Sequence, residues 1–287
     1  MPQRLVITGA GGMVGRILAG QARQQGRDVL ALTSSECDIT DPGAVAHAVA
    51  ADDVVVNCAA YTDVDAAESD PQRAHAVNAD GPGVLAQACA RAGAGLIHLS
   101  TDYVFGGDFG GAPPRPYDVD DPTGPLSVYG HSKLAGERAV LVAKPDAYVV
   151  RTAWVYEGAA GTDFVAVMRR RAAGTDELEV VADQIGSPTS AADLAGALLQ
   201  IADGGVRGPL LHAANGGQAS RYDQACAVFE ALGADPARVR PVTSDRFPRP
   251  ARRPAFSALA GAGSAARGLT PLRGWREALE SALRAAS

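Results

Sequence analysis

The sequence predicts an α/β protein in which a doubly wound parallel sheet carries a smaller C-terminal cap. Two observations lead to this prediction. The short apolar run at residues 5–7 passes directly into a glycine cluster and then into a helical pattern, which is the order strand, turn, helix. Short apolar runs and helical patterns then alternate through the first half of the chain. Such alternation is typical of a Rossmann-like sheet that helices cover on both faces.

The first half supplies the elements of this sheet in a regular order. Strands are expected at residues 29–32, 54–57, 96–100 and 147–151, the first two of them buried. Helices are expected at residues 74–90, which include Asn78, and at residues 132–143. Ligands of such sheets bind beyond the carboxyl ends of the strands. Gly12, Ala59, Ala60 and Thr101 all fall just past strand ends, so we expect them near a ligand.

The pattern loosens after residue 151. Helices are expected at residues 163–173, 191–202, 221–232 and 274–285, with loop-like stretches between them. The Ala/Gly-rich stretch at residues 258–266 is either a mobile segment or a helix. We therefore predict a first domain at residues 1–151, completed by elements within about 187–214, and a cap at residues 152–186 and 215–287.

Composition excludes several classes of function. The chain has 287 residues, a net charge of −6 and no long run of Lys and Arg, so nucleic acid is not an expected partner. No apolar run approaches the roughly 20 residues of a membrane span. The 4 cysteines show no C-x-x-C pairing and the 5 histidines no metal-ligand spacing. We expect no disulfide framework and no metal site, a reducing cytoplasm as the location, and His98 as a packed side chain.

The glycine cluster has the spacing Gly9-x-x-Gly12-x-x-Gly15. Glycine permits backbone angles closed to other residues and lets a pyrophosphate approach the main chain, and the following helix offers free N–H groups. The spacing differs from G-x-G-x-x-G, because Val14 stands where the last glycine would be. The alternative is a glycine-rich turn of an ordinary α/β protein. The flanking strand and helix favour a dinucleotide site.

A second motif places a phenol beside an amine. Tyr129 and Lys133 are four residues apart, and a helix carries residues i and i+4 on one face. The ammonium group is expected to lower the pKa of the phenol from about 10, so that Tyr129 exchanges a proton with a carbonyl or alcohol oxygen. Alone, this spacing also fits a solvated helix face. Its combination with the glycine turn and with Ser100-Thr101-Asp102 favours catalysis.

These three motifs together resemble the extended short-chain dehydrogenase/reductases. Longer strings narrow the resemblance to the dTDP-4-dehydrorhamnose reductase family, in its actinobacterial style. They are NCAAYTDVDAAE at residues 57–68, LSTDYVFGG at 99–107, RTAWVY at 151–156 and DQIGSPT at 183–189. The resemblance runs from Leu5 to about Trp275.

The resemblance implies an NADPH-dependent enzyme that reduces the C4 keto group of dTDP-4-dehydro-6-deoxy-L-mannose to dTDP-L-rhamnose, a precursor of cell-surface polysaccharide. Tyr129 would be the proton donor, Lys133 would tune it and hold the nicotinamide ribose, and Thr101 would place a hydroxyl on the substrate oxygen. The implied cofactor contacts are Gly9, Gly12, Met13, Val14, Gly15, Thr33, Asp38, Ile39, Ala59, Ala60, Tyr61 and Thr62, with Tyr129 and Lys133. The implied substrate contacts are Thr101, Asp102, Tyr103, Tyr129 and Trp154. From the residues alone, Trp154 is equally well a core aromatic, and Tyr103 could pack under a loop.

Two positions depart from the family pattern. Glu157 follows Trp-Val-Tyr where the family usually has Gly, so that loop is expected to differ in shape. Asp163 stands where an Asn often precedes Phe-Val of the next helix. Neither belongs to the catalytic set.

The choice of cofactor depends on the end of the second strand. NAD enzymes often place an acid there, on the adenosine ribose. Here the strand ends at Thr33-Ser34-Ser35, without an acid and also without an arginine to hold a 2′-phosphate, and Glu36 follows. We expect NADPH, with NADH as the alternative.

Other functions stay open within this superfamily. Sugar-nucleotide dehydratases typically follow the Thr with Asp-Glu, whereas Thr101 is followed by Asp102-Tyr103. A non-catalytic regulatory subunit that resembles the methionine adenosyltransferase β subunit would not need an intact Thr, Tyr and Lys. A 4-ketoreductase for another dTDP-deoxysugar is not separated by these motifs. The resemblance also suggests a homodimer.

Overall fold

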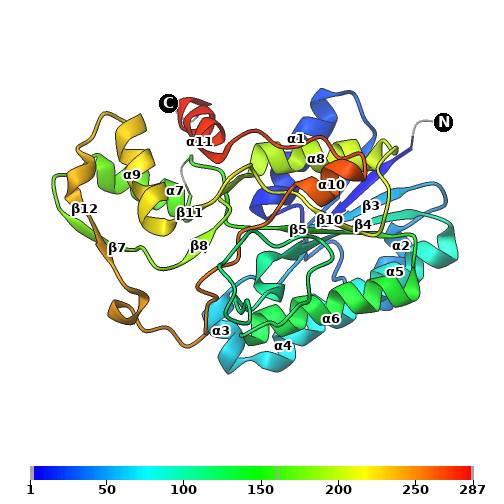
Figure 1. Cartoon of the computed structure of the whole chain (residues 1–287). Coiled ribbons are helices and arrows are strands. Elements are labelled where there is room, and N and C mark those ends of the chain that lie inside the picture. Colours follow the sequence, from blue (N-terminus) through cyan, green and yellow to red (C-terminus); the bar gives the residue numbers. More distant parts are fainter. Residues whose placement is uncertain (1–2, 160, 286–287) are drawn as a thin grey trace.

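A six-stranded parallel sheet lies at the centre of the protein, in the order β10-β5-β4-β3-β1-β2 (Figure 1). The structure is a computed structural model and describes residues 3–159 and 161–285. The strands of the sheet are β1 (Leu5–Thr8), β2 (Val29–Leu32), β3 (Val54–Asn57), β4 (Gly95–Thr101), β5 (Tyr148–Thr152) and β10 (Leu210–His212). This arrangement confirms the predicted doubly wound α/β class.

The strands differ in burial because of their places in the sheet. β1 and β3 are buried at every residue, as their runs of Val, Ile and Leu predict. The prediction that β2 is also buried is wrong, because all four of its residues are only half-buried. Among the described residues β2 is the last strand of the sheet and pairs with β1 alone, so one of its edges has no neighbouring strand there.

Helices cover both faces of the sheet (Figure 1). α1 (Met13–Gln24) and α8 (Ala191–Ala202) lie on one face and share a core with β1. α2 (Pro42–Ala48), α5 (Gly81–Ala92) and α6 (Val128–Ala143) lie on the other. α6 begins four residues before its predicted start, because Ser127 accepts a hydrogen bond from Gly130 N at 3.1 Å and caps the helix there.

The predicted helix at residues 74–90 is interrupted. It consists of α4 (Pro71–His75), a π-helical segment (Ala76–Asp80) and α5, and it follows the short α3 (Val64–Ser69). Asn78 lies inside the π-helical segment and is fully buried. Single π-helical turns of this kind are frequent at functional sites.

The second half of the chain forms a smaller body beside the sheet (Figure 1). Its helices are α7 (Phe164–Ala172), α9 (Arg221–Ala231) and α11 (Trp275–Ala285), which pack with β7 (Leu178–Val181) and β12 (Val239–Val242) around one core. Short strand pairs link this body to the sheet: β6 (Val155–Tyr156) with β9 (Thr189–Ser190), and β8 (Ile185–Gly186) with β11 (Ala219–Ser220). Single 3-10 turns lie at Asp102–Val104, Pro236–Arg238 and Ser244–Arg246.

One part of the predicted cap packs elsewhere. The stretch at residues 258–266 forms a helix only at its end, α10 (Ala262–Ala266). Ser264 Oγ accepts a hydrogen bond from His212 N of β10 at 2.7 Å, and Leu269 joins the core under the sheet. These residues therefore lie with the first domain, beside β10 of the sheet and the core that α8 shares with β1. The division at residues 1–151, 152–186, 187–214 and 215–287 otherwise remains a prediction, and residues 1, 2, 160, 286 and 287 lie outside the described residues.

Within residues 3–159 and 161–285, no helix has the length and apolar character needed to cross a bilayer. In the same residues, no group of three or more His, Cys, Asp and Glu side chains could hold a metal ion. Cys37, Cys58, Cys89 and Cys226 are free thiols. His98 is fully buried in β4, where burial lowers its pKa, and it is a packed side chain as predicted.

Candidate active site

The turn between β1 and α1 is built so closely that only glycine fits at two positions. Gly9 has φ +70°, and a Cβ there would lie 2.5 Å from Ala59 N. A Cβ on Gly15 would lie 2.5 Å from Gly9 O. Gly12 precedes α1 without any side-chain cap, and the first turn of α1 contains no acidic residue. The N-terminus of α1 therefore offers free N–H groups and a partial positive charge to an anion, beside the half-buried Met13 and Val14.

A buried hydrogen-bond network holds the segment after β3 against this turn. Thr8 Oγ1 donates to Asn57 Oδ1 at 2.8 Å, and Ala59 N donates to the same oxygen at 3.0 Å. Asn78 accepts from Tyr61 N at 2.8 Å and donates to Tyr61 O at 3.0 Å. Ala59, Ala60, Tyr61 and Thr62 thus lie along the carboxyl edge of the sheet, as the cofactor interpretation requires.

The residues expected around the adenosine differ in their exposure and in their hydrogen bonds. Thr33 follows β2, and both its N–H and its hydroxyl donate to Glu36, at 2.8 and 2.7 Å. Asp38 is exposed and accepts from Thr40, whereas the Ile39 side chain is 3% exposed and packs in the core.

Thr101 and Tyr129 meet at the carboxyl end of β4. Thr101 is the last residue of the strand and Tyr129 lies in the first turn of α6, and the Thr101 side chain is close enough to influence the pKa of the Tyr129 phenol. Buried Glu137 anchors α6 by accepting from Ser100 at 2.6 Å and from Arg151 at 2.9 and 2.7 Å. The strand end and the helix therefore hold these two hydroxyl groups together.

The electrostatics at Tyr129 differ from the prediction. Lys133 is 2% exposed, and its Nζ donates to Leu99 O at 2.6 Å. Burial raises the pKa of Tyr129 above its ordinary value, and the nearby Thr101 hydroxyl only partly opposes this. The expectation that Lys133 lowers the pKa of Tyr129 is wrong for this structure, because desolvation dominates. Burial also lowers the pKa of Lys133 to about 8.

Asp102 lies where the first domain meets the cap. It is 2% exposed, and its two oxygens accept from Thr101 Oγ1 at 3.1 Å and from Ser257 Oγ at 2.6 Å. Burial raises its pKa to about 6, against these two hydrogen bonds. Both oxygens are thus engaged by the chain's own hydroxyl groups, and Asp102 is placed to orient Thr101.

Three half-buried side chains connect this strand end to the cap. The Tyr103 ring meets the Tyr129 ring edge-on, with 5.7 Å between centroids. Trp154 has φ +47°, an uncommon value for a residue other than glycine, and its indole packs against Gly186, where any Cβ would collide with it. Arg221, the first residue of α9, stacks on that indole with its guanidinium carbon 3.6 Å from the ring centroid.

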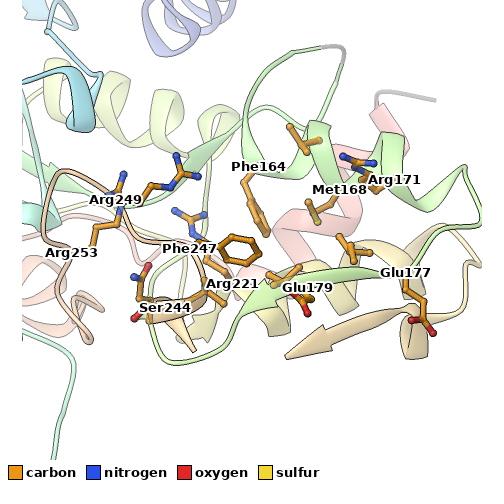
Figure 2. Close-up of a pocket in the computed structure, with 15 residues that line it drawn as sticks. Phe164, Met168, Arg171, Glu177, Glu179, Arg221, Ser244, Phe247, Arg249 and Arg253 are labelled. Atoms are coloured by element: carbon orange, nitrogen blue, oxygen red, sulfur yellow. The ribbon is translucent and has the colours of Figure 1, made fainter. Parts of the chain in front are cut away.

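Beyond Arg221 the cap contains a cavity of about 520 Å³. Figure 2 shows the guanidinium groups of Arg221, Arg249 and Arg253 at one end of it and the rings of Phe164 and Phe247 near its middle. Glu177 and Glu179 also line it, but they pair with Arg240 and Arg246. Arginines with aromatic rings suit an anionic ligand that carries a flat ring.

The comparisons with known proteins agree with this geometry. A family model described as RmlD substrate binding domain matches residues 3–287. The chain belongs to this family. It is 67% identical over 287 residues to dTDP-4-dehydrorhamnose reductase of Mycolicibacterium smegmatis, covering 99% of this chain and 86% of that one. It is also 41% identical to dTDP-4-keto-6-deoxy-D-glucose reductase of Streptomyces niveus, covering 98% and 97% of the two chains.

Solved structures of the RmlD family have the same fold. The crystal structure of dTDP-4-dehydrorhamnose reductase from Bacillus anthracis in complex with NADP matches with a TM-score of 0.92 at 34% identity, covering 99% of this chain and 100% of that one. The UDP-glucose 4-epimerase of Thermus thermophilus matches with a TM-score of 0.81 at 21% identity, covering 99% of this chain and 100% of that one, which shows a shared fold only.

The two departures from the family pattern have local explanations. Glu157 Oε2 pairs with Arg16 of α1 at 2.5 Å and so ties the cap to the glycine turn. Asp163 accepts from Ala166 N at 3.0 Å and caps α7, a role in which Asp and Asn are nearly equivalent.

Sequence reasoning missed the cationic side of the site. Arg221, Arg249 and Arg253 were not among the predicted residues, although all three line the cavity. Arg249 stands in the loop-like string Phe-Pro-Arg-Pro, and Arg221 opens a predicted helix, so both positions were visible. Their convergence was not, because Arg221 opens α9 whereas Arg249 and Arg253 share a later loop, and these two segments meet only in the folded cap.

Proposed function

We propose that this chain reduces the C4 keto group of dTDP-4-dehydro-6-deoxy-L-mannose to dTDP-L-rhamnose with NADPH. The proposal depends most on one observation, the juxtaposition of Thr101 and Tyr129 at a strand end between a dinucleotide turn and a cationic cavity. The names of the family relatives support the same substrate class. It is a sugar nucleotide with an oxidised carbon, for which reduction needs a hydride and a proton.

NADPH, when bound, supplies the hydride. The collision that a Cβ would make at Gly9 and the uncapped N-terminus of α1 fit a pyrophosphate there, with Gly12, Met13 and Val14 around it. Lys133 would hold the nicotinamide ribose. No carboxylate directly follows β2 at Thr33, which permits a 2′-phosphate, whereas Glu36 bonds back to Thr33 instead of facing a ribose.

Tyr129 would act as the general acid. Because burial raises its pKa, its hydroxyl keeps the proton at neutral pH and can give it to the C4 oxygen as negative charge develops there. The Thr101 hydroxyl donates to Asp102 in this structure and would turn to donate to the same oxygen when the substrate binds. Lys133, with a pKa of about 8, is largely protonated at neutral pH, and its Nζ donates to Leu99 O at 2.6 Å.

The cap would hold the remainder of the substrate. The arginines Arg221, Arg249 and Arg253 suit its diphosphate, and the aromatic part of the cavity suits the thymine ring. Trp154 and Tyr103 lie between this cavity and Tyr129, which is where the sugar would be placed. Asp102 would act on the substrate through Thr101.

The test is a coupled assay. The protein is combined with the preceding dehydratase and epimerase, and loss of NADPH or NADH absorbance is followed with and without the dTDP-sugar. Consumption that requires the 4-keto sugar is expected, faster with NADPH. No consumption with either cofactor would overturn the proposal and favour a non-catalytic subunit of the same fold.

A second 4-ketoreductase activity is favoured by one finding, the 41% identity to the Streptomyces niveus reductase, whose name gives a different dTDP-sugar. Chromatography of the product with authentic standards separates rhamnose from its C4 epimer. Dehydration is disfavoured, because Tyr103 stands where dehydratases carry a Glu.

The setting of the enzyme is part of the proposal. We propose a cytoplasmic homodimer whose first domain binds the dinucleotide and whose cap binds the substrate. Four free thiols favour a reducing compartment. Light scattering coupled to size exclusion measures the oligomeric state.

A further inference from the structure

The short helix α3 lies between the cofactor segment and both sides of the site. It follows Tyr61 and Thr62 directly, and Asp63 caps its N-terminus by accepting from Ala66 N at 2.9 Å. Asp65 and Glu68 are three residues apart on this helix, so they lie on neighbouring positions of one face. Neither carboxylate has a role in the chemistry described above.

Asp65 holds the cap arginines from the side of the first domain. Its two oxygens accept from Arg253 at 3.0 and 2.9 Å, an arrangement in which the guanidinium is bound through two nitrogens. Asp65 also accepts from Ala251 N at 3.2 Å and lies 3.6 Å from Arg249. The side chains of Asp65 and Arg253 are only 24% and 20% exposed. One carboxylate therefore fixes the loop that carries two of the four arginines that line the cavity.

Glu68 holds the catalytic helix. Its Oε1 accepts from Val128 N at 2.9 Å, and Val128 is the first residue of α6. Ser127 accepts from Gly130 N at 3.1 Å in the same turn. Two of the otherwise unpaired N–H groups at this helix end are thus satisfied on either side of Tyr129. A carboxylate near the N-terminus of a helix also interacts favourably with the helix dipole.

We propose that Asp65 and Glu68 are positioning residues that set the two halves of the substrate site from one helix. Asp65 directs Arg253 and Arg249 toward a nucleoside diphosphate in the cavity, and Glu68 keeps the first turn of α6 where Tyr129 meets Thr101. This inference rests on the proposed function for the identity of the ligand. It goes beyond that function because it assigns control of ligand binding to Asp65 and control of proton transfer to Glu68, two residues of one helix.

The experiment compares four variants, three on α3 and one at its N-cap residue Asp63. Asp65→Asn removes the charge that holds Arg253, and Glu68→Ala removes the acceptor for Val128 N. Asp63→Asn is the matched control, since it removes one charge from the same helix while Asn caps nearly as well as Asp. Calorimetry measures Kd for dTDP and for NADPH, and steady-state kinetics give kcat and KM.

Asp65→Asn is expected to raise Kd for dTDP and KM for the sugar nucleotide about tenfold, with kcat and Kd for NADPH close to those of Asp63→Asn. Glu68→Ala is expected to lower kcat about tenfold at unchanged Kd for dTDP, because Tyr129 moves away from Thr101. Glu68→Gln should restore most of kcat, since its amide oxygen can accept from Val128 N.

Three results would overturn the inference. They are a Kd for dTDP in Asp65→Asn within about twofold of the control, a kcat in Glu68→Ala equal to the control, and a loss of NADPH binding in either variant, which would indicate general disruption. If the wild-type protein binds dTDP but reduces no dTDP-sugar, the proposed function is wrong. The effect of Asp65→Asn on Kd for dTDP would still test the role of Asp65.

Discussion

The two sides of the site recognise their ligands by different physical means. The first domain presents main-chain groups, with two glycines that admit no Cβ and a bare helix N-terminus. The cap presents arginine side chains from α9 and from the loop at residues 247–253, together with the aromatic rings of Phe164 and Phe247. Main-chain recognition depends on shape and tolerates almost no change at a few positions. Side-chain recognition depends on charge, so single substitutions should weaken it in steps.

Tyr129 acts in the reaction itself and not in either kind of recognition, so removing its hydroxyl group should have the largest effect on activity. Tyr129→Phe keeps the ring against Tyr103 and removes the proton, so kcat should fall about 10²–10⁴-fold while Kd for NADPH and for dTDP stay unchanged. Stopped-flow measurement of NADPH oxidation checks this. Turnover near that of the wild type would remove Tyr129 from the chemistry.

Gly9→Ala tests recognition by the main chain. The new methyl group would lie 2.5 Å from Ala59 N at φ +70°, so we expect NADPH binding to weaken about hundredfold or more and the melting temperature to drop. Gly20→Ala is the control, since Gly20 lies inside α1 with nothing within 4 Å of an added Cβ. It should stabilise the protein by about 0.5–1 kcal/mol. Equal NADPH affinity in both variants would contradict the shape argument.

Arg221→Gln tests recognition by charge. The substitution keeps a polar side chain but removes the cation beside Trp154, so KM for the sugar nucleotide should rise about 10–100-fold. Kd for NADPH should not change, because the expected cofactor contacts lie in the first domain and Arg221 lies in the cap. A parallel loss of NADPH affinity would mean that the two sides are not separate.

Asp102→Asn tests the contact between the first domain and the cap. The pKa of Asp102 is raised from 3.8 to about 6, so the stability that this group contributes is fully present below about pH 3.8 and is lost as pH rises through about 6. The variant lacks this titration. Its melting temperature relative to the wild type should therefore increase between about pH 4 and pH 7. A difference that is constant with pH would show that Asp102 keeps an ordinary pKa.

Glu157→Gln should have the smallest effect. The pair with Arg16 joins the cap to α1, but the side chains are 28% and 56% exposed. Removing the charge should change the free energy of unfolding by less than about 1 kcal/mol, and high salt should abolish the difference. Urea unfolding at low and at high salt measures it. A larger loss would make this pair a true link between the two sides.

The sequence determined the elements of the first domain and the residues that act through local geometry. The glycine spacing and the Tyr129–Lys133 interval depend on one turn and one helix, and both are present as predicted. Short-range order of this kind is encoded in neighbouring residues. The burial of β2 was mispredicted because a strand pattern does not reveal which strand ends the sheet.

Only the tertiary structure decided the environment of these residues. The raised pKa of Tyr129 comes from burial by several segments, and it reversed an expectation based on Lys133 alone. The contact between Asp65 and Arg253 joins residues 188 positions apart, and no local sequence pattern predicts such a pair. Desolvation and long-range ion pairs are sums over neighbours in space, so they exist only once the chain has folded.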